Sequence, residues 1–291
     1  MKLSQYRINV INITTQPHSP ENYIQLFKKA FAQSPVKTKY FGTDNISLRD
    51  IRIQEDADYS IVTGNIYKFT QISDNDWYDA IKGCPLSDDN KPQFDTSRLF
   101  PNLTTYPFCF IANGHRFFFV SKFKQDSLSV KFLTHSLYNL LNTPELIEEF
   151  GKVTVFVETD IQTLDEINAI DILQTLQIKL YLPNDDDISN EKERFVKRMK
   201  NQNARGISET LIAEKGQTII PDEETKAHME LALSNGIIIA KGIENEKKVV
   251  KRSIDSPQEF NEDYIERNGS LSQHIIDFAK KKINFFIKRQ L

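Results

Sequence analysis

The chain has 291 residues, with 37 Lys and Arg against 40 Asp and Glu, which gives a formal net charge of −3. Hydrophobic residues make up 39% and charged residues 26%, so the composition excludes disordered and collagen-like chains and allows a real core. No run of about 18 apolar residues is present, so we expect no membrane-spanning helix. The two cysteines, Cys84 and Cys109, suit a reducing compartment, and we expect a cytoplasmic protein.

The first 104 residues predict a strand, a helix and two further strands. Residues 6–13 alternate like a strand, and Ser19 is a good N-cap for a helix of about 14 residues. Strand-like runs follow at 48–53 and 59–72. Residues 73–104 contain acidic turns and Trp77, and we expect a loop whose role the sequence does not define.

The clearest local signal lies between residues 107 and 121, where two apolar runs flank Asn113 and Gly114. Asn-Gly between apolar runs predicts a two-residue hairpin, because both turn positions need positive φ. The runs are apolar on both faces, which favours a central position in a sheet. A helix with a leucine stripe should follow and end before Pro144.

The second half of the chain predicts another α/β module. Residues 153–158, 161–174 and 177–182 read as strand, helix and strand, an order that favours parallel strands. Further helices are expected at 189–204, 221–235 and 270–291, with a hairpin between 237 and 254. We therefore predict an α+β fold of two α/β modules with mixed sheets flanked by helices, comprising residues 1–150 and 151–291.

The search for chemistry finds no phosphate-binding glycine loop, no nucleophile motif and no metal-binding histidine pair, so we expect no bound metal or cofactor. Cys109 lies in an apolar strand and should be inert. One candidate remains, in which Glu158 and Asp160 end a strand and Lys179 lies on the next. Restriction-enzyme-like nucleases use this pattern to hold Mg²⁺ at a phosphate. The alternative is that Asp160 caps a helix and Lys179 extends from a sheet edge.

A second candidate is a basic stripe. Residues 1–190 carry a net charge of −6 and residues 191–291 a net charge of +3. On the helix predicted at 189–204, cations fall within about a 100° arc, and a lysine cluster lies in the last helix. The predicted contacts to a DNA or RNA backbone are Arg194, Lys197, Arg198 and Arg205, followed by Lys280, Lys281 and Lys282. The alternative is an ordinary solvated helix face.

Several segments together resemble a bacterial family of domains of unknown function that is found near mobile elements and phage-defence genes. The segments are Asn9–Tyr23, Trp77–Tyr78, the strands around Asn113, Leu180–Asp186, Pro221–Thr225 and Leu233–Gly236. More distantly, the order of elements is similar to that of the Rex-type phage-exclusion A protein. That resemblance implies two α/β modules, sequence-independent DNA binding and self-association.

These observations lead to one leading expectation and two alternatives. The leading expectation is a non-enzymatic, cytoplasmic phage-defence protein of the abortive-infection or exclusion type that binds or senses nucleic acid as a homo-oligomer. The first alternative is a Mg²⁺-dependent nuclease that uses Glu158, Asp160 and Lys179. The second is a scaffold or effector partner of a neighbour-encoded defence protein.

Overall fold

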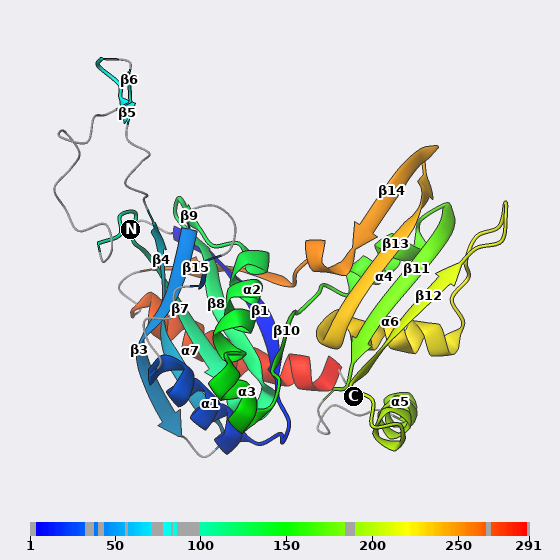
Figure 1. Ribbon diagram of the computed structural model, residues 1–291, viewed down its shortest axis with the longest axis horizontal. Coiled ribbons are helices and arrows are strands. Elements are labelled where there is room, and N and C mark those ends of the chain that lie inside the picture. Colours follow the sequence, from blue (N-terminus) through cyan, green and yellow to red (C-terminus); the bar gives the residue numbers. More distant parts are fainter. Residues whose placement is uncertain are drawn as a thin grey trace.

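Two antiparallel sheets lie side by side, each with helices packed against it (Figure 1). The computed structural model describes residues 4–32, 38–39, 44–55, 58–71, 78–82, 84–85, 99–183, 190–265 and 269–289. The predicted α+β class is confirmed, but the paired strands are antiparallel and the sheets are not mixed. Trp77 and most of the loop predicted at 73–104 fall outside the described residues, and the described part includes the short pair β5 (Tyr78–Asp79) and β6 (Cys84–Pro85).

The first sheet has the strand order β10-β1-β8-β7-β4-β3-β2. Two strands lie off this path, because β15 pairs with the first half of β1 and β9 pairs with β8. The bounds of its strands are β1 (Ser4–Thr14), β2 (Thr38–Lys39), β3 (Asp44–Glu55), β4 (Ser60–Thr70), β7 (Thr104–Ile111), β8 (Arg116–Phe123), β9 (Asp126–Ser127), β10 (Thr154–Val157) and β15 (Glu259–Tyr264).

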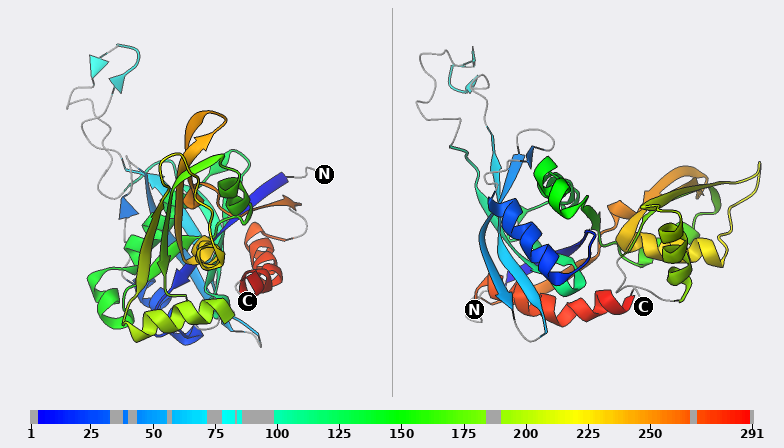
Figure 2. Two further views of the ribbon diagram at one scale, coloured as in Figure 1. Left: turned by 90° about the vertical axis from the view of Figure 1, so that its right-hand side faces the viewer. Right: turned by 60° about the horizontal axis from the view of Figure 1, so that its bottom comes forward.

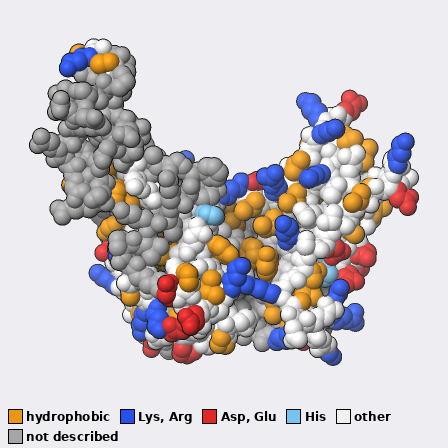
Figure 3. Space-filling view, viewed as in Figure 1, with side chains coloured by type: hydrophobic (Ala, Val, Ile, Leu, Met, Phe, Trp, Pro, Cys, Tyr) orange, Lys and Arg blue, Asp and Glu red, His pale blue; other side chains and the backbone are white. Residues whose placement is uncertain are grey.

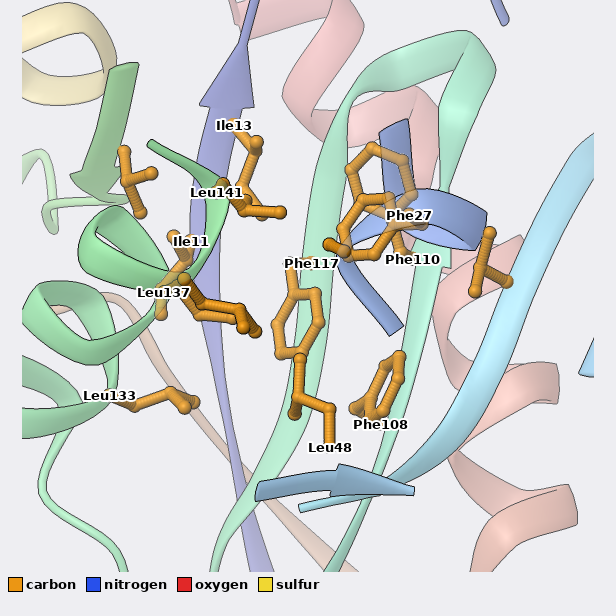
Figure 4. Close-up of a cluster of buried hydrophobic side chains, with 14 of the residues drawn as sticks. Ile11, Ile13, Phe27, Leu48, Phe108, Phe110, Phe117, Leu133, Leu137 and Leu141 are labelled. Atoms are coloured by element: carbon orange, nitrogen blue, oxygen red, sulfur yellow. The ribbon is translucent and has the colours of Figure 1, made fainter. Parts of the chain in front are cut away.

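Helices cover both faces of the first sheet (Figure 2). One face packs against α1 (Pro20–Ala32), α2 (Val130–Leu141) and α3 (Pro144–Phe150), and the other against α7 (Leu271–Arg289). The core under α1, α2 and α3 contains the stacked rings of Phe108 and Phe117, whose centroids are 4.6 Å apart (Figure 4). Successive side chains of β7 and β8 point into the cores on opposite faces of the sheet, so both strands must be apolar on both faces. Their predicted central position in the sheet is confirmed.

The turn between β7 and β8 differs from the predicted two-residue turn. Four residues connect the strands, and His115, at φ 44°, takes the left-handed conformation that we expected at Asn113 and Gly114. The Asn113 side chain instead accepts a hydrogen bond from the Ser60 backbone N–H at 2.7 Å. A Cβ on Gly114 would lie 2.4 Å from a methyl group of Ile283, so this glycine is needed for the close approach of α7.

The second sheet is smaller and has the order β12-β11-β13-β14. Its strands are β11 (Ile172–Tyr181), β12 (Gly206–Ile212), β13 (Gly236–Glu244) and β14 (Lys247–Arg252). The core on one face is closed by α4 (Gln162–Asn168), α5 (Asn190–Asn201) and α6 (Glu223–Asn235). In the view of Figure 1, α4 and α6 lie behind the strands and α5 lies below them. The opposite face carries no helix of the described residues.

The two sheets divide the chain differently from the predicted ranges 1–150 and 151–291. The elements of the second sheet occupy residues 162–252, while β10, β15 and α7 belong to the first sheet. The prediction that residues 153–158 and 177–182 form neighbouring parallel strands is wrong, since β10 pairs with β1 and β11 pairs with β12 and β13. The chain leaves the first sheet after β10 and returns to it at β15.

The two segments that connect the sheets, one after β10 and one before β15, are hydrogen bonded to each other. Gln258 N–H donates to the carbonyl of Glu158 at 2.7 Å, and Asp160 N–H donates to the carbonyl of Ser256 at 3.0 Å. The end of α6 joins the same place, because the amide of Asn12 in β1 donates to the carbonyl of Ser234. The link between the sheets is therefore a hydrogen-bonded joint and not a single strand of linker.

A buried ion pair lies at the centre of this joint. The Arg116 guanidinium is 2.6 Å from the Glu158 carboxylate, and both side chains are at most 1% exposed. Arg116 also donates to Asn12 Oδ1 at 3.1 Å and to the carbonyl of Gly114 at 2.9 Å. The other Glu158 oxygen accepts from the Ser234 hydroxyl at 2.8 Å. One network therefore ties β1, β8, the end of β10 and the end of α6 together.

His115 lies beside this network and is itself 1% exposed. Its ring stacks on Tyr23, with the centroids 6.4 Å apart, and meets the edge of His18. Burial, reinforced by the positive charge of Arg116, holds the pKa of His115 well below its ordinary value. The folded protein therefore keeps this ring neutral at pH values where the unfolded chain would charge it.

We predict that Glu158→Ala lowers the free energy of unfolding by about 3–5 kcal/mol, because it leaves the Arg116 charge buried without its partner. Chemical denaturation measures the change. Lys131→Ala is the matched control, since it removes an ion pair with Asp255 in which both side chains are nearly half exposed, and it should cost less than about 1 kcal/mol. Equal effects of the two substitutions would contradict the structural role of Glu158.

A second prediction concerns the stability of the protein at acidic pH. Below about pH 6.5 the unfolded chain binds a proton at residue 115 that the folded protein does not, so this site lowers stability by about 1.4 kcal/mol for each pH unit. His115→Asn should remove that part of the slope, and Asn tolerates the left-handed backbone. Urea unfolding between pH 6.5 and 5 measures it, with His135→Asn as the control at an exposed histidine. Identical slopes for wild type and His115→Asn would refute the prediction.

Candidate nucleic-acid interface

The residues of the predicted nuclease site are not brought together. Glu158 is used in the buried ion pair with Arg116. Asp160 accepts a hydrogen bond from Gln162 N–H at 2.9 Å just before α4, but Ile161 and not Asp160 occupies the N-cap position of this helix. Lys179 is exposed on β11, in the other sheet. The motif needs its acids and its lysine on adjacent strands, and these strands are not adjacent.

The predicted basic stripe on α5 is exposed but faces acids. Arg194, Lys197 and Arg198 point away from the core that Phe195 and Met199 enter. Arg194 and Arg198 line a pocket of about 360 Å³ between α5 and α6, and two further lining residues, Glu223 and Glu224, come from the first turn of α6. Arg205 lies beyond the helix and donates to the carbonyl of Lys152 at 2.8 Å. Carboxylates therefore offset part of the stripe.

The lysine cluster of α7 is also placed next to acids. Lys281 and Lys282 border a surface hollow together with carboxylates that include Glu262 and Asp277. The Lys282 ammonium lies over the ring of Phe260, 5.2 Å from its centroid. Lys280 is half-buried, and its charge acts on the thiol of Cys109. This cluster belongs to the first sheet, whereas the α5 stripe belongs to the second.

The uncovered face of the second sheet has a different composition, and we call it the open face. Strand pairing fixes which side chains share it, because alternate residues of a strand point to the same side. From the joint outward, its cross-strand rows are Ser208, Lys179 and Ile237; Thr210, Gln177, Ile239 and Arg252; Ile212, Thr175, Lys241 and Val250; and Ile172, Ile243 and Lys248.

Four cations of the open face are exposed: Lys179, Lys241, Lys248 and Arg252. They span four rows, which is about 20 Å along the strands. Within the part of the chain that the structure describes, none of the four forms an ion pair or a side-chain hydrogen bond. No acidic residue of the four strands shares this face, so no carboxylate of these strands offsets the four charges there.

The acids of these strands point to the side that the helices cover. Glu209 lies 3.2 Å from the ring of His228 in α6, and Glu244 lies 2.7 Å from the Lys251 ammonium. Because pairing fixes the alternation, acids and free cations are separated onto opposite faces of one sheet. Figure 3 shows Lys and Arg side chains around the hollow between the two sheets, with hydrophobic side chains among them.

Apolar side chains fill the spaces between the cations of the open face. Ile237, Ile239 and Ile243 are half-buried on β13, while Val250 is 53% exposed. At the end nearest the joint, Tyr181 is 36% exposed, and its ring lies 5.2 Å from the ring of Phe156 in β10. Branched apolar residues and cations are therefore interleaved on the open face, and an aromatic pair that bridges the two sheets lies at its end.

Sequence reasoning missed Lys241, Lys248 and Arg252. The signal was present in the predicted hairpin at 237–254, where residues 237, 239, 241 and 243 alternate with residues that the structure buries. That pattern places the cations on one side of the hairpin, but it does not tell whether helices cover that side. Lys179 was identified, but as part of the predicted nuclease motif.

The other kinds of site considered, a cysteine nucleophile and a metal site, lack support among the described residues. Cys109 is buried, and burial raises the pKa of its thiol, so the residue is unsuited to act as a nucleophile. Among the described residues, no group of three His, Cys, Asp or Glu side chains is placed to hold a metal ion. No helix in the described ranges is both long and apolar enough to cross a membrane.

Comparison with known proteins adds one finding. A family model described as Domain of unknown function (DUF4747) matches residues 4–280, nearly the whole chain. No curated protein matches the chain. The family match covers both sheets and includes the open face.

Proposed function

The chain belongs to the family described as Domain of unknown function (DUF4747), and we propose that it binds the phosphate backbone of DNA or RNA on the open face of its second sheet. Binding is independent of sequence, because phosphates are the same whichever base they carry. The distant resemblance to phage-exclusion proteins suggests phage defence as the setting for this activity.

The observation that carries the proposal is the separation of charge across the second sheet. Four exposed cations share the open face with no carboxylate of its strands, although the protein as a whole carries a net charge of −3. Each cation that meets a phosphate releases condensed counterions, so affinity comes from charge and falls with salt. Nearby acids would weaken such binding by repelling the phosphates.

The open face suits this role better than the stripe on α5. Glu223 and Glu224 line the same pocket as Arg194 and Arg198, so a phosphate that approached the arginines would meet carboxylates as well. The contacts predicted for α5, Arg205 and α7 stay predictions. The nuclease alternative lacks support, because the strands that carry Glu158 and Lys179 lie in different sheets.

We predict that the triple variant Lys179→Gln, Lys241→Gln and Arg252→Gln binds a 20-nucleotide DNA about ten-fold or more weakly than wild type, because it removes phosphate contacts. Its plot of log affinity against log salt concentration should be shallower by about 2–3 units. Fluorescence anisotropy at several salt concentrations measures both. All three positions are exposed, so the fold should be retained, and urea denaturation checks this.

The matched control neutralises Arg194, Lys197 and Arg198 to Gln, the same change of charge on the opposite side of the second sheet. It should retain most of the affinity and of the salt slope. If only the α5 variant loses binding, the interface lies on α5 and the open face is not the site. If wild-type protein binds no nucleic acid at low salt and is not retained on heparin, a protein-binding scaffold is the better explanation.

A further inference from the structure

We propose that the nucleic acid bound on the open face is single-stranded, and that unpaired bases lie on Tyr181 and on the isoleucines between the cations. This inference rests on the proposed function and specifies its ligand class. A duplex presents mainly phosphates to a flat surface, whereas a single strand also exposes the faces of its bases. The open face offers a surface for both the phosphates and the bases of a single strand.

The first observation is the arrangement of the two kinds of side chain. Lys179 is paired with Ile237, and Arg252 is paired with Ile239, so each of these rows places a cation beside an apolar side chain. Phosphates alone would not require the branched apolar residues. Exposed apolar groups such as Val250 are covered when the flat face of a base rests on them.

The second observation is the aromatic pair at the end of the open face. Tyr181 lies two residues after Lys179 on β11, so the two side chains share a face about 6.7 Å apart. The Tyr181 ring contacts Phe156, with the planes inclined at 40°, and this contact with the first sheet supports the ring at the edge of the open face. A base that stacks on Tyr181 would place its strand beside the Lys179 ammonium.

The third observation is a small hollow of about 90 Å³ beside this pair, lined by Phe156, Ile237 and Ile254 among others. The hydroxyls in its wall already have partners within the protein. Thr134 donates to the carbonyl of Val130 at 2.8 Å, and Ser253 accepts from Ile238 N–H at 3.0 Å. The hollow therefore offers mainly apolar contact, which fits binding without sequence preference.

The test compares three 20-mer probes: a single-stranded oligothymidine, a duplex of the same length, and an abasic single strand with the same number of phosphates. Wild type should bind oligothymidine more tightly than either of the others. Tyr181→Ala should weaken binding to oligothymidine by about 5- to 100-fold and leave binding to the abasic strand unchanged. Tyr181→Phe retains the ring and should behave as wild type.

The outcomes separate this inference from the proposed function. Equal wild-type affinity for the three probes, or a Tyr181→Ala variant that still binds oligothymidine as wild type does, overturns base stacking but leaves phosphate binding intact. Equal loss on oligothymidine and on the abasic strand also overturns it, because the substitution would then act through the fold or the charge. Absence of binding to all three probes at low salt overturns the proposed function itself.

Discussion

The buried ion pair between Arg116 and Glu158 is the constraint on which the arrangement of this molecule depends. Arg116 follows directly after the β7–β8 turn, and it contacts β1, the end of β10 and, through the ring of Phe286, helix α7. Removing two charges from water costs free energy, which their attraction offsets only when the remaining polar atoms also find partners. Ser234 supplies a partner for one Glu158 oxygen and Asn12 for one Arg116 nitrogen. Ser234 lies at the end of α6, and Asn12 donates to Asn235 there.

Because that network joins the first sheet to α6, which packs against the second sheet, it fixes how the second sheet is held against the first. The two crossing segments are hydrogen bonded to each other, and Thr159 N–H donates to the carbonyl of Leu233 at the end of α6. The second sheet is therefore held by the two connecting segments and by the end of α6. Its helices cover one face, and the joint lies at its end, so the other face stays open to solvent (Figure 1).

The proposed function rests on an unequal use of the two sheets. The first sheet has helices on both faces and provides most of the core, with phenylalanines that alternate between the two sides. The second sheet has one covered face, where Glu209 and Glu244 pair with His228 and Lys251, and one open face, where the cations form no ion pair with any described residue. An interface for a polyanion needs such a surface more than it needs a positive net charge.

Local patterns identified much of the architecture. Alternation and capping predicted β1, α1, the central strands β7 and β8, the hairpin of β13 and β14, and the final helix, because each depends on neighbours in sequence. The sequence could not tell that β10 and β11 lie in different sheets. A strand, a helix and a strand in succession fit one parallel sheet as well as two antiparallel ones, and only long-range pairing distinguishes them.

For the site, the sequence by itself determined which residues carry charge and which of them alternate along a strand, since both properties are local. The tertiary structure alone decided that Glu158 is buried against Arg116, that the arginines of α5 face acids, and that Lys179, Lys241, Lys248 and Arg252 meet on one surface. The physical reason is that coverage of a sheet face depends on where helices pack, and packing joins residues that are far apart in the chain.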